Sequence, residues 1–168
     1  ATTGGYIDLR RIFVKNLTMF EVSSTDGEVV ADSRVERIKR KRSLGDLAAQ
    51  YATNDTTAKE ILESFHKAIV EPENCLRHLY DIRDALDQKF GNGKETRMAL
   101  NLSRAQWDNL GRLANKEPLR QGRHPGKRLE ELRDATPDEL HTAKKIAVEM
   151  VEKYLRYLDA TKDEGNAA

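Results

Sequence analysis

The sequence has little of what several specialised protein classes depend on. Its 168 residues include one cysteine, Cys75, four prolines and 6% aromatic residues. A single thiol cannot form an internal disulfide, so a disulfide-rich secreted scaffold is excluded and a reducing, cytoplasmic location is expected. No apolar run is long enough to span a bilayer. No charged-then-apolar leader is found either, so neither a membrane anchor nor a secretory signal is expected.

Charge and hydrophobicity are balanced. Charged residues make up 34% of the chain and apolar residues 38%, while the formal net charge is only +1. These values are typical of a helix-rich globular domain, and the length leaves room for one domain with a small appendage. Any anion-binding surface must therefore be a local cluster of cations. The sequence has no glycine-rich phosphate loop and no histidine–carboxylate set at metal-ligand spacing, so neither a cofactor nor a metal is expected.

The first 33 residues are rich in β-branched and aromatic side chains. With an Asp-Gly turn signal at 26–27, this composition predicts strands at about 6–14, 17–23 and 28–32. A short helix capped by Ser43 is expected further along the chain. Between these elements lies a basic run, interpreted either as a solvated linker or helix end or as a phosphate-binding patch. Its cations are Arg34, Arg37, Lys39, Arg40, Lys41 and Arg42.

From about residue 56 to residue 158, the apolar residues follow a helical period. Apolar residues recur at intervals of three and four, which predicts helices at about 56–70, 72–90, 94–101, 103–115 and 136–158. Two capping boxes are expected, Ser103 with Gln106 and Thr136 with Glu139. Helices with one apolar face and short connections predict a mainly α fold, an antiparallel helical bundle with a small N-terminal β segment of two or three strands.

This pattern predicts three parts. Residues 1–52 form an N-terminal β-hairpin segment with the basic linker and a short helix. Residues 53–160 form the helical bundle, and residues 161–168 form a polar, frayed tail.

One predicted connection, 116–128, is long for a helical bundle and strongly basic. It contains two prolines and two glycines, and Glu117 is its only acid. Its cations are Lys116, Arg120, Arg123, Lys127 and Arg128. Such a cluster suits a phosphodiester, because the arginine fork holds two phosphate oxygens at once. His124 is the only group of the loop whose ordinary pKa permits proton transfer near neutrality.

An arginine beside a histidine is suited to metal-independent RNA cleavage. A base removes the proton of the ribose 2′-hydroxyl, the alkoxide attacks the adjacent phosphate, and an arginine stabilises the charge that develops. The structural alternative pairs Arg120 and Arg123 with carboxylates at a helix end and leaves 124–126 as a turn. The candidate carboxylates are Glu130 and Asp134.

Four short motifs follow one another between about 72 and 158. They are Leu79-Tyr80, Trp107 leading to Leu113-Ala114-Asn115, Arg123-His124-Pro125-Gly126, and Tyr154-Leu155-Arg156-Tyr157-Leu158. Together they resemble the HEPN domain, the higher eukaryotes and prokaryotes nucleotide-binding helical family, over about half of the chain. The resemblance implies a four-helix bundle, commonly a dimer whose two subunits share an RNase active site, of a kind found in toxin–antitoxin and antiviral defence systems.

The HEPN catalytic pattern is an arginine, four to six residues, and a histidine. Here Arg120 leaves three residues before His124, and Gln121 follows the arginine. The resemblance thus implies Arg120 and His124 as catalytic candidates in a shifted variant, or else a branch that binds RNA or protein without cutting. The candidate RNA-backbone ligands are Arg123, Lys127, Arg128, Arg37, Lys39, Arg40, Lys41 and Arg42.

Two function classes follow from these observations. The first is a HEPN-like RNA-binding or metal-independent RNA-cleaving module of a toxin or defence system. The second is a non-catalytic helical module that dimerises or docks on a larger partner protein, and a chain that begins at Ala1 fits a piece of a larger protein. A DNA-binding regulator is not favoured, because no predicted helix pair has the short turn and basic second helix of a helix-turn-helix unit.

Overall fold

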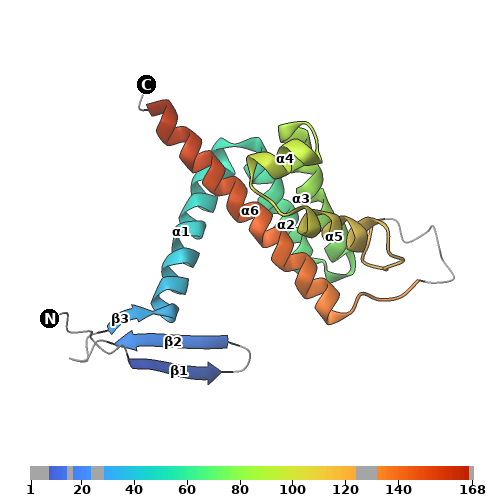
Figure 1. The fold of residues 1–168 in the computed structure, drawn as a ribbon. Helices are drawn as coiled ribbons and strands as arrows, with labels where there is room; N and C mark the ends of the chain where they lie inside the picture. Colours follow the sequence, from blue (N-terminus) through green and yellow to red (C-terminus); the bar gives the residue numbers. More distant parts are fainter. Residues whose placement is uncertain (1–7, 15–16, 24–28, 124–131, 167–168) are drawn as a thin grey trace. The chain divides into compact units, whose positions relative to one another are not determined.

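The computed structural model describes residues 8–14, 17–23, 29–123 and 132–166 (Figure 1). The chain is mainly helical, as predicted, and divides into two compact units. We call residues 1–46 the N-terminal unit and residues 47–168 the helical unit. In the described part of the chain, no helix combines the length and the apolar character needed to cross a bilayer.

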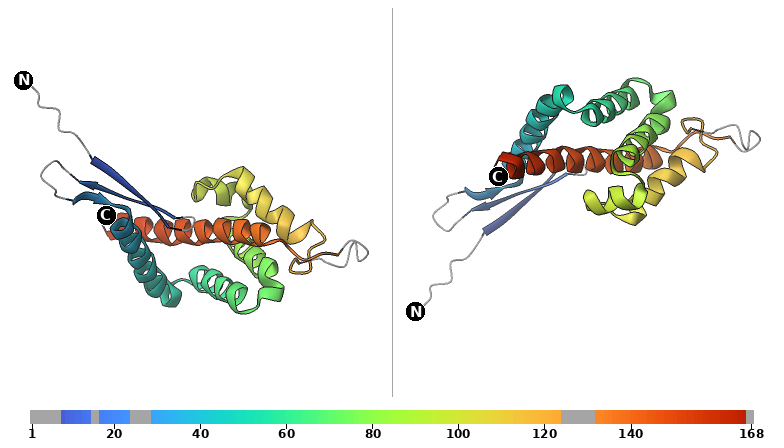
Figure 2. Two further views of the ribbon diagram at one scale, coloured as in Figure 1. Left: turned by 90° about the horizontal axis from the view of Figure 1, so that it is seen from below. Right: turned by 90° about the horizontal axis from the view of Figure 1, so that it is seen from above.

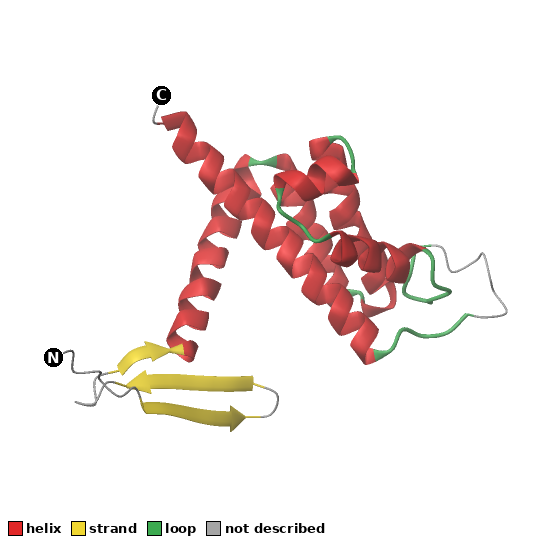
Figure 3. Cartoon of the chain, in the orientation of Figure 1, coloured by secondary structure: helices red, strands yellow, loops and turns green. Residues whose placement is uncertain are grey.

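The N-terminal unit contains an antiparallel sheet (Figure 3). Its strands, in sheet order, are β1 (Asp8–Val14), β2 (Leu17–Ser23) and β3 (Val29–Asp32). The register places Val14 opposite Leu17, and every residue of β1 has a partner in β2. An irregularity between Val22 and Ser23 shifts the pairing of β2 with β3.

The basic run lies on a single long helix, α1 (Ser33–Asn54), which continues into the helical unit. The predicted short helix with Ser43 as its cap was wrong, because Ser43 and Gly45 lie in the interior of α1. Serine and glycine are only weakly unfavourable inside a helix, and each added residue of a nucleated helix gains a hydrogen bond. Packing also stabilises the end of α1, where Leu47 and Tyr51 are buried.

The other described elements of the helical unit match the predicted helices closely. They are α2 (Thr56–Val70), the 3₁₀ turn η1 (Pro72–Asn74), α3 (Cys75–Phe90), α4 (Gly93–Ala99), α5 (Arg104–Asn115) and α6 (Pro137–Asn166). The tail was expected to fray from residue 161, but α6 continues to Asn166. The Thr161 hydroxyl donates to the Tyr157 carbonyl oxygen at 3.0 Å, so the polar side chain is accommodated within the helix.

Of the two predicted capping boxes, one forms and one does not. The Thr136 backbone N–H donates to Glu139 Oε2 at 2.8 Å, and the Glu139 N–H donates to Thr136 Oγ1 at 3.2 Å. Ser103 makes no side-chain cap. Gln106 Nε2 donates instead to Glu149 Oε2 on α6 at 2.6 Å, a contact that sequence spacing does not reveal. A carboxylate acceptor makes the stronger hydrogen bond.

The core of the helical unit centres on α3, which packs against α2, α4, α5 and α6 (Figure 2). Helices α2, α3, α5 and α6 all contribute large side chains that are fully buried. In chain order these are Ile61, Leu76, Leu79, Ile82, Leu86, Leu110, Leu113, Met150, Tyr154 and Leu155. Leu119, which follows α5, is also fully buried. The first half of the basic loop is therefore anchored in the core.

Candidate functional site

The structure describes the basic loop up to Arg123 and again from residue 132. Arg120 and Arg123 can therefore be placed. Four residues of the sequence interpretation lie outside the described residues, namely His124, Lys127, Arg128 and Glu130.

Backbone hydrogen bonds join the two ends of this loop. The Arg120 N–H donates to the Arg133 carbonyl oxygen at 3.0 Å, and the Arg133 N–H donates to the Pro118 carbonyl oxygen at 3.1 Å. Leu119 and Arg133 thereby form a short parallel bridge, with the Leu119 side chain in the core. The backbone on both sides of Arg120 is held in place by the fold.

The turn after Arg120 is attached to the end of α5. The Gly122 N–H donates to the Leu119 carbonyl oxygen at 2.9 Å, and the Arg123 N–H donates to the Ala114 carbonyl oxygen at 2.7 Å. A Cβ at Gly122 would lie 3.1 Å from both of these carbonyl oxygens, so the turn accommodates a side chain poorly at this position. These hydrogen bonds fix the backbone of Arg123 against the end of α5.

Gln121 connects this turn to α3 and to the segment before α6. Its carbonyl oxygen accepts the N–H of Arg77, in the first turn of α3, at 3.1 Å. Its side-chain Oε1 accepts the Ala135 N–H at 3.0 Å, and its Nε2 donates to Asp134 Oδ1 at 3.2 Å. The first turn of a helix leaves backbone N–H groups without partners inside the helix, so the loop supplies one of the missing acceptors.

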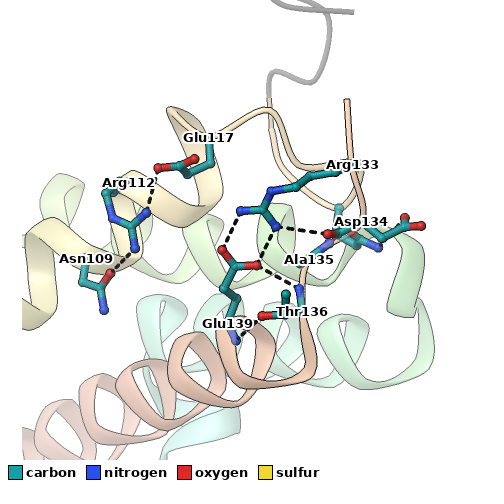
Figure 4. Close-up of polar contacts among 9 residues, drawn as sticks. Asn109, Arg112, Glu117, Arg133, Asp134, Ala135, Thr136 and Glu139 are labelled. Carbon is teal, nitrogen blue, oxygen red and sulfur yellow. Dashed lines mark hydrogen bonds and ion pairs between the residues drawn. The ribbon is translucent and has the colours of Figure 1, made fainter. Parts of the chain in front are cut away.

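Figure 4 shows the polar contacts at the end of α5 and at the start of α6. Arg133 donates to both carboxylate oxygens of Glu139, at 2.7 and 2.8 Å, and this pairing is the main reason that the pKa of Glu139 falls to about 2. The same pairing raises the pKa of Arg133. Glu117, expected to oppose the loop cations, accepts instead from Arg112 of α5 at 2.7 Å.

Arg120 is an exposed cation of the described part of the loop, and it has a carboxylate neighbour. Its side chain is 59% exposed, and its Nε lies 3.8 Å from Oδ1 of Asp134, which is 72% exposed. This is the pairing that the structural alternative predicted. An exposed pair at this separation contributes less than about 1 kcal/mol. The contact therefore leaves Arg120 able to exchange Asp134 for another anion.

Arg123 pairs with a carboxylate other than the two that the structural alternative named. Its Nη1 donates to Asp84 Oδ2 on α3, and its guanidinium carbon lies 5.2 Å from the centre of the Tyr80 ring. The hydrogen bond to Asp84 is the main reason that the pKa of Arg123 is raised. Neither Tyr80 nor Asp84 was selected as a site residue from the sequence. Their four-residue spacing places them on one face of a helix, but only the tertiary structure brings that face to the loop.

A second guanidinium reaches the same ring. Arg83 lies 5.3 Å from the centre of Tyr80 and 4.5 Å from that of Trp107, and its Nη1 donates to the Trp107 carbonyl oxygen at 3.1 Å. A Cβ at Gly111 would collide with this guanidinium. Trp107 is 3% exposed, so its ring packs in the core and is not available to stack on a base.

An acidic groove lies between α2 and α3. Its volume is about 340 Å³, and its lining residues are Glu60, Ser64, Asp81, Asp84, Ala85 and Gln88. The carboxylates disfavour a phosphate in this groove. Arg123 contacts it through Asp84, so the basic loop and the acidic groove meet at one ion pair.

His78 is a described histidine with carboxylate neighbours. Its Nε2 lies 2.9 Å from Glu71 Oε2, and its Nδ1 lies 3.7 Å from Asp81 Oδ2. The hydrogen bond with His78 lowers the pKa of Glu71. No group of three or more potential metal ligands occurs within the described ranges. Through its contact with Glu71, His78 connects the end of α2 to α3.

The candidate RNA-binding cations outside the basic loop belong to the N-terminal unit. Lys39, Arg40, Lys41 and Arg42 are exposed on α1, whereas Arg37 is half-buried. Lys39 pairs with Glu36 at 3.2 Å, one helical turn away. These cations lie on a helix and not on a linker, and a solvated stretch of helix was part of the first of the two interpretations.

Comparison with known proteins gave no match: no family model, curated protein or solved structure is similar to this chain by these searches.

Proposed function

We propose that this chain is a HEPN-like RNA-binding module that cleaves RNA without a metal, as part of a toxin or antiviral defence system. The proposal includes the corresponding fold, an antiparallel bundle with an N-terminal β segment. It also includes a cytoplasmic location and association with either a second copy of the chain or a partner protein.

The observation that carries this proposal is the setting of Arg120. Its backbone is hydrogen-bonded to Arg133, whereas its guanidinium is 59% exposed beside an exposed carboxylate at 3.8 Å. A rigid backbone with an accessible guanidinium is suited to catalysis, because the donor is positioned before the substrate arrives. A phosphate that accepts two N–H bonds from arginine makes a stronger contact than this loose pair.

In the proposed reaction, His124 removes the proton of a ribose 2′-hydroxyl. The resulting alkoxide attacks the adjacent phosphorus, and the bond to the 5′-oxygen breaks as that oxygen receives a proton. The products are a 2′,3′-cyclic phosphate and a 5′-hydroxyl end. Arg120 stabilises the charge on the phosphoryl oxygens. Arg123, Lys127, Arg128 and the α1 cations hold the RNA backbone, with contacts that carry little sequence information.

The test is cleavage of a mixed-sequence single-stranded RNA in EDTA by the wild type, Arg120→Ala and His124→Ala. We expect cyclic phosphate ends from the wild type, and a rate lower by about a hundredfold or more in both variants. Arg112→Ala is the matched control, because it removes an arginine of the same region that pairs with Glu117. Circular dichroism melts of all four proteins establish that they are folded.

Binding is measured separately with a 2′-O-methyl RNA, which cannot form the attacking alkoxide. Binding without cleavage by the folded wild type would reject the nuclease and retain the RNA-binding module. Neither binding nor cleavage would reject the whole proposal.

A non-catalytic interaction module is the second candidate, favoured by one observation. Ile69 and Val70 are adjacent in the last turn of α2 and are 58% and 55% exposed. Light scattering of the double variant Ile69→Ser/Val70→Ser tests this function. Loss of a dimer in this variant, with retention in Met98→Ser, would place the self-association surface at Ile69 and Val70, since Met98 is an exposed apolar residue on α4. A monomeric wild type would contradict self-association through this surface.

A further inference from the structure

We infer that Asp84 is an internal competitor of RNA: it holds Arg123 in the free protein and releases it when a phosphate of the RNA backbone binds. This inference rests on the proposed RNA-binding function and concerns the regulation of the same loop. It makes Asp84, a residue of α3, the determinant of how much of the loop's positive charge is available.

The geometry places the pair at the surface. The Arg123 side chain is 38% exposed and the Asp84 side chain 35% exposed, and the contact between them uses Nη1 of the guanidinium. Arginine carries five N–H donors, so one guanidinium can contact a second anion before it leaves the first. Phosphate can thus reach Arg123 without prior opening of the fold.

The energetics also permit the exchange. A half-exposed ion pair is weak, because water and salt screen both charges. Phosphate oxygens offer the same type of charge-assisted hydrogen bond and bring further contacts to the neighbouring cations. The ring of Tyr80, 5.2 Å from the guanidinium carbon, supports Arg123 from another side. The cation–π contact is compatible with either anion.

The turn does not depend on the ion pair. The Arg123 N–H donates to Ala114, the Gly122 N–H donates to Leu119, and Gln121 accepts from Arg77. These bonds use backbone atoms and remain available when Asp84 is replaced. The removal of the carboxylate is therefore expected to release the Arg123 side chain while the backbone beneath it stays in place.

Asp81 provides a matched control. It lies on the same helix, lines the same groove and has the same charge, but its near neighbour is His78, at 3.7 Å. Both Asp84→Asn and Asp81→Asn remove one negative charge from the groove. The charge of Asp81 also raises the pKa of Arg123, but the hydrogen bond to Asp84 is the larger cause. A gain in RNA affinity that is larger in Asp84→Asn than in Asp81→Asn therefore points to the hydrogen-bonded pair.

The experiment measures binding of a fluorescent single-stranded 2′-O-methyl RNA to the full chain by anisotropy at about 0.1 M salt, near the physiological range. We expect Asp84→Asn to bind about three- to fivefold more tightly than Asp81→Asn, in keeping with the small free energy of an exposed pair. In the Arg123→Gln background, the Asp84→Asn substitution should give no such gain. The effect would then be assigned to the pair itself and not to the charge of the groove.

Two results would overturn the inference while leaving the RNA-binding function intact. One is equal affinity of Asp84→Asn and Asp81→Asn, and the other is a gain that persists without Arg123. If no variant binds RNA, Asp84→Asn included, both the inference and the proposed function fail. Circular dichroism melts of the four single and double variants show whether each one is folded.

Discussion

At the scale of single residues, Glu139 combines two stabilising roles in one carboxylate. It accepts from the Thr136 N–H at the start of α6 and from both Nη atoms of Arg133. These contacts lower its pKa from 4.5 to about 2. A folded-state pKa below the unfolded value means that the stabilisation is present above about pH 4.5 and is lost as the pH falls toward 2.

The substitution Glu139→Gln tests this role. Glutamine retains an acceptor for Thr136 but loses the charge that pairs with Arg133, so we expect the free energy of unfolding at pH 7 to fall by about 1 kcal/mol. Urea denaturation at pH 7, 5 and 3 should show the deficit shrinking between pH 5 and pH 3. Asp138→Asn removes a first-turn charge without this contact. An equal, pH-independent loss in both variants would contradict the prediction.

Thr96 offers a second prediction at this scale. Its side chain is fully buried, and its hydroxyl donates to Asp87 Oδ1 at 2.9 Å. Burial raises the pKa of Asp87, and this hydrogen bond partly opposes the increase. Thr96→Val keeps the shape but removes the donor, so we expect the pKa of Asp87 to rise further and the folded state to lose about 1–2 kcal/mol at pH 7.

NMR titration of the Asp87 carboxyl and urea denaturation measure these two effects of Thr96→Val. The stability deficit should be largest above the pKa of Asp87, where the carboxylate is charged and short of a donor. Thr53→Val is the control, because Thr53 is exposed on α1. An unchanged Asp87 pKa would show that the Thr96 hydrogen bond does not stabilise the charged form of the carboxyl group.

At the scale of secondary-structure elements, two helical glycines are expected to respond in opposite directions to alanine. A Cβ at Gly93, the first residue of α4, would lie 2.9 Å from Nε1 of the buried Trp107. A Cβ at Gly45, within α1, would meet no atom within 4 Å. The first glycine permits a close contact between α4 and α5, whereas the second only lowers the helix propensity of α1.

We therefore expect Gly93→Ala to destabilise the folded state by about 1–3 kcal/mol, because a buried ring has no room to move. Gly45→Ala should stabilise α1 by about 0.5–1 kcal/mol. Urea denaturation measures the first effect, and amide hydrogen exchange within α1 measures the second. Changes of the same sign in the two variants would contradict the packing argument for Gly93.

The positions of several helices in the helical unit could be predicted from the local spacing of apolar residues. The apolar spacing of α2, α3 and α5 predicted both ends of these helices to within a few residues, and it predicted the start of α6, since each buries a stripe that repeats with the helical period. The break expected at Ser43 does not occur, because a weak local preference is overridden by propagation of the helix and by packing at its end.

At the scale of the whole molecule, the division into two units has a consequence for folding. Among the residues whose burial is described, every core side chain lies between Leu47 and Leu155, all in the helical unit. We expect a fragment covering 47–168 to unfold cooperatively by itself, with a midpoint in urea close to that of the full chain. Loss of cooperative unfolding in this fragment would show that its core depends on the N-terminal unit.

Salt dependence distinguishes the two proposed functions for the whole chain. If about five loop and helix cations contact RNA phosphates, affinity should fall by about a hundredfold between about 50 and 200 mM salt. Self-association through apolar residues such as Ile69 should change little over the same range. Anisotropy and light scattering on the same samples measure both. An RNA affinity that does not depend on salt would contradict backbone binding by these cations.

The sequence by itself determined the features that depend on neighbours within one or two helical turns. These are the mainly helical fold, the positions of α2, α3 and α5, the Thr136–Glu139 cap and the local excess of cations around Arg120. Periodic burial and capping act over three or four residues, so they can be recognised in a single chain.

Only the tertiary structure decided which partners the polar side chains take across different helices and loops. Gln106 contacts Glu149 instead of closing its own cap, and Arg123 contacts Asp84, which lies 39 residues earlier in the chain. Each such contact contributes little free energy by itself, so the sequence carries no local signal for it. The choice follows from which helix faces the core brings together, and that is set by the sum of many buried contacts.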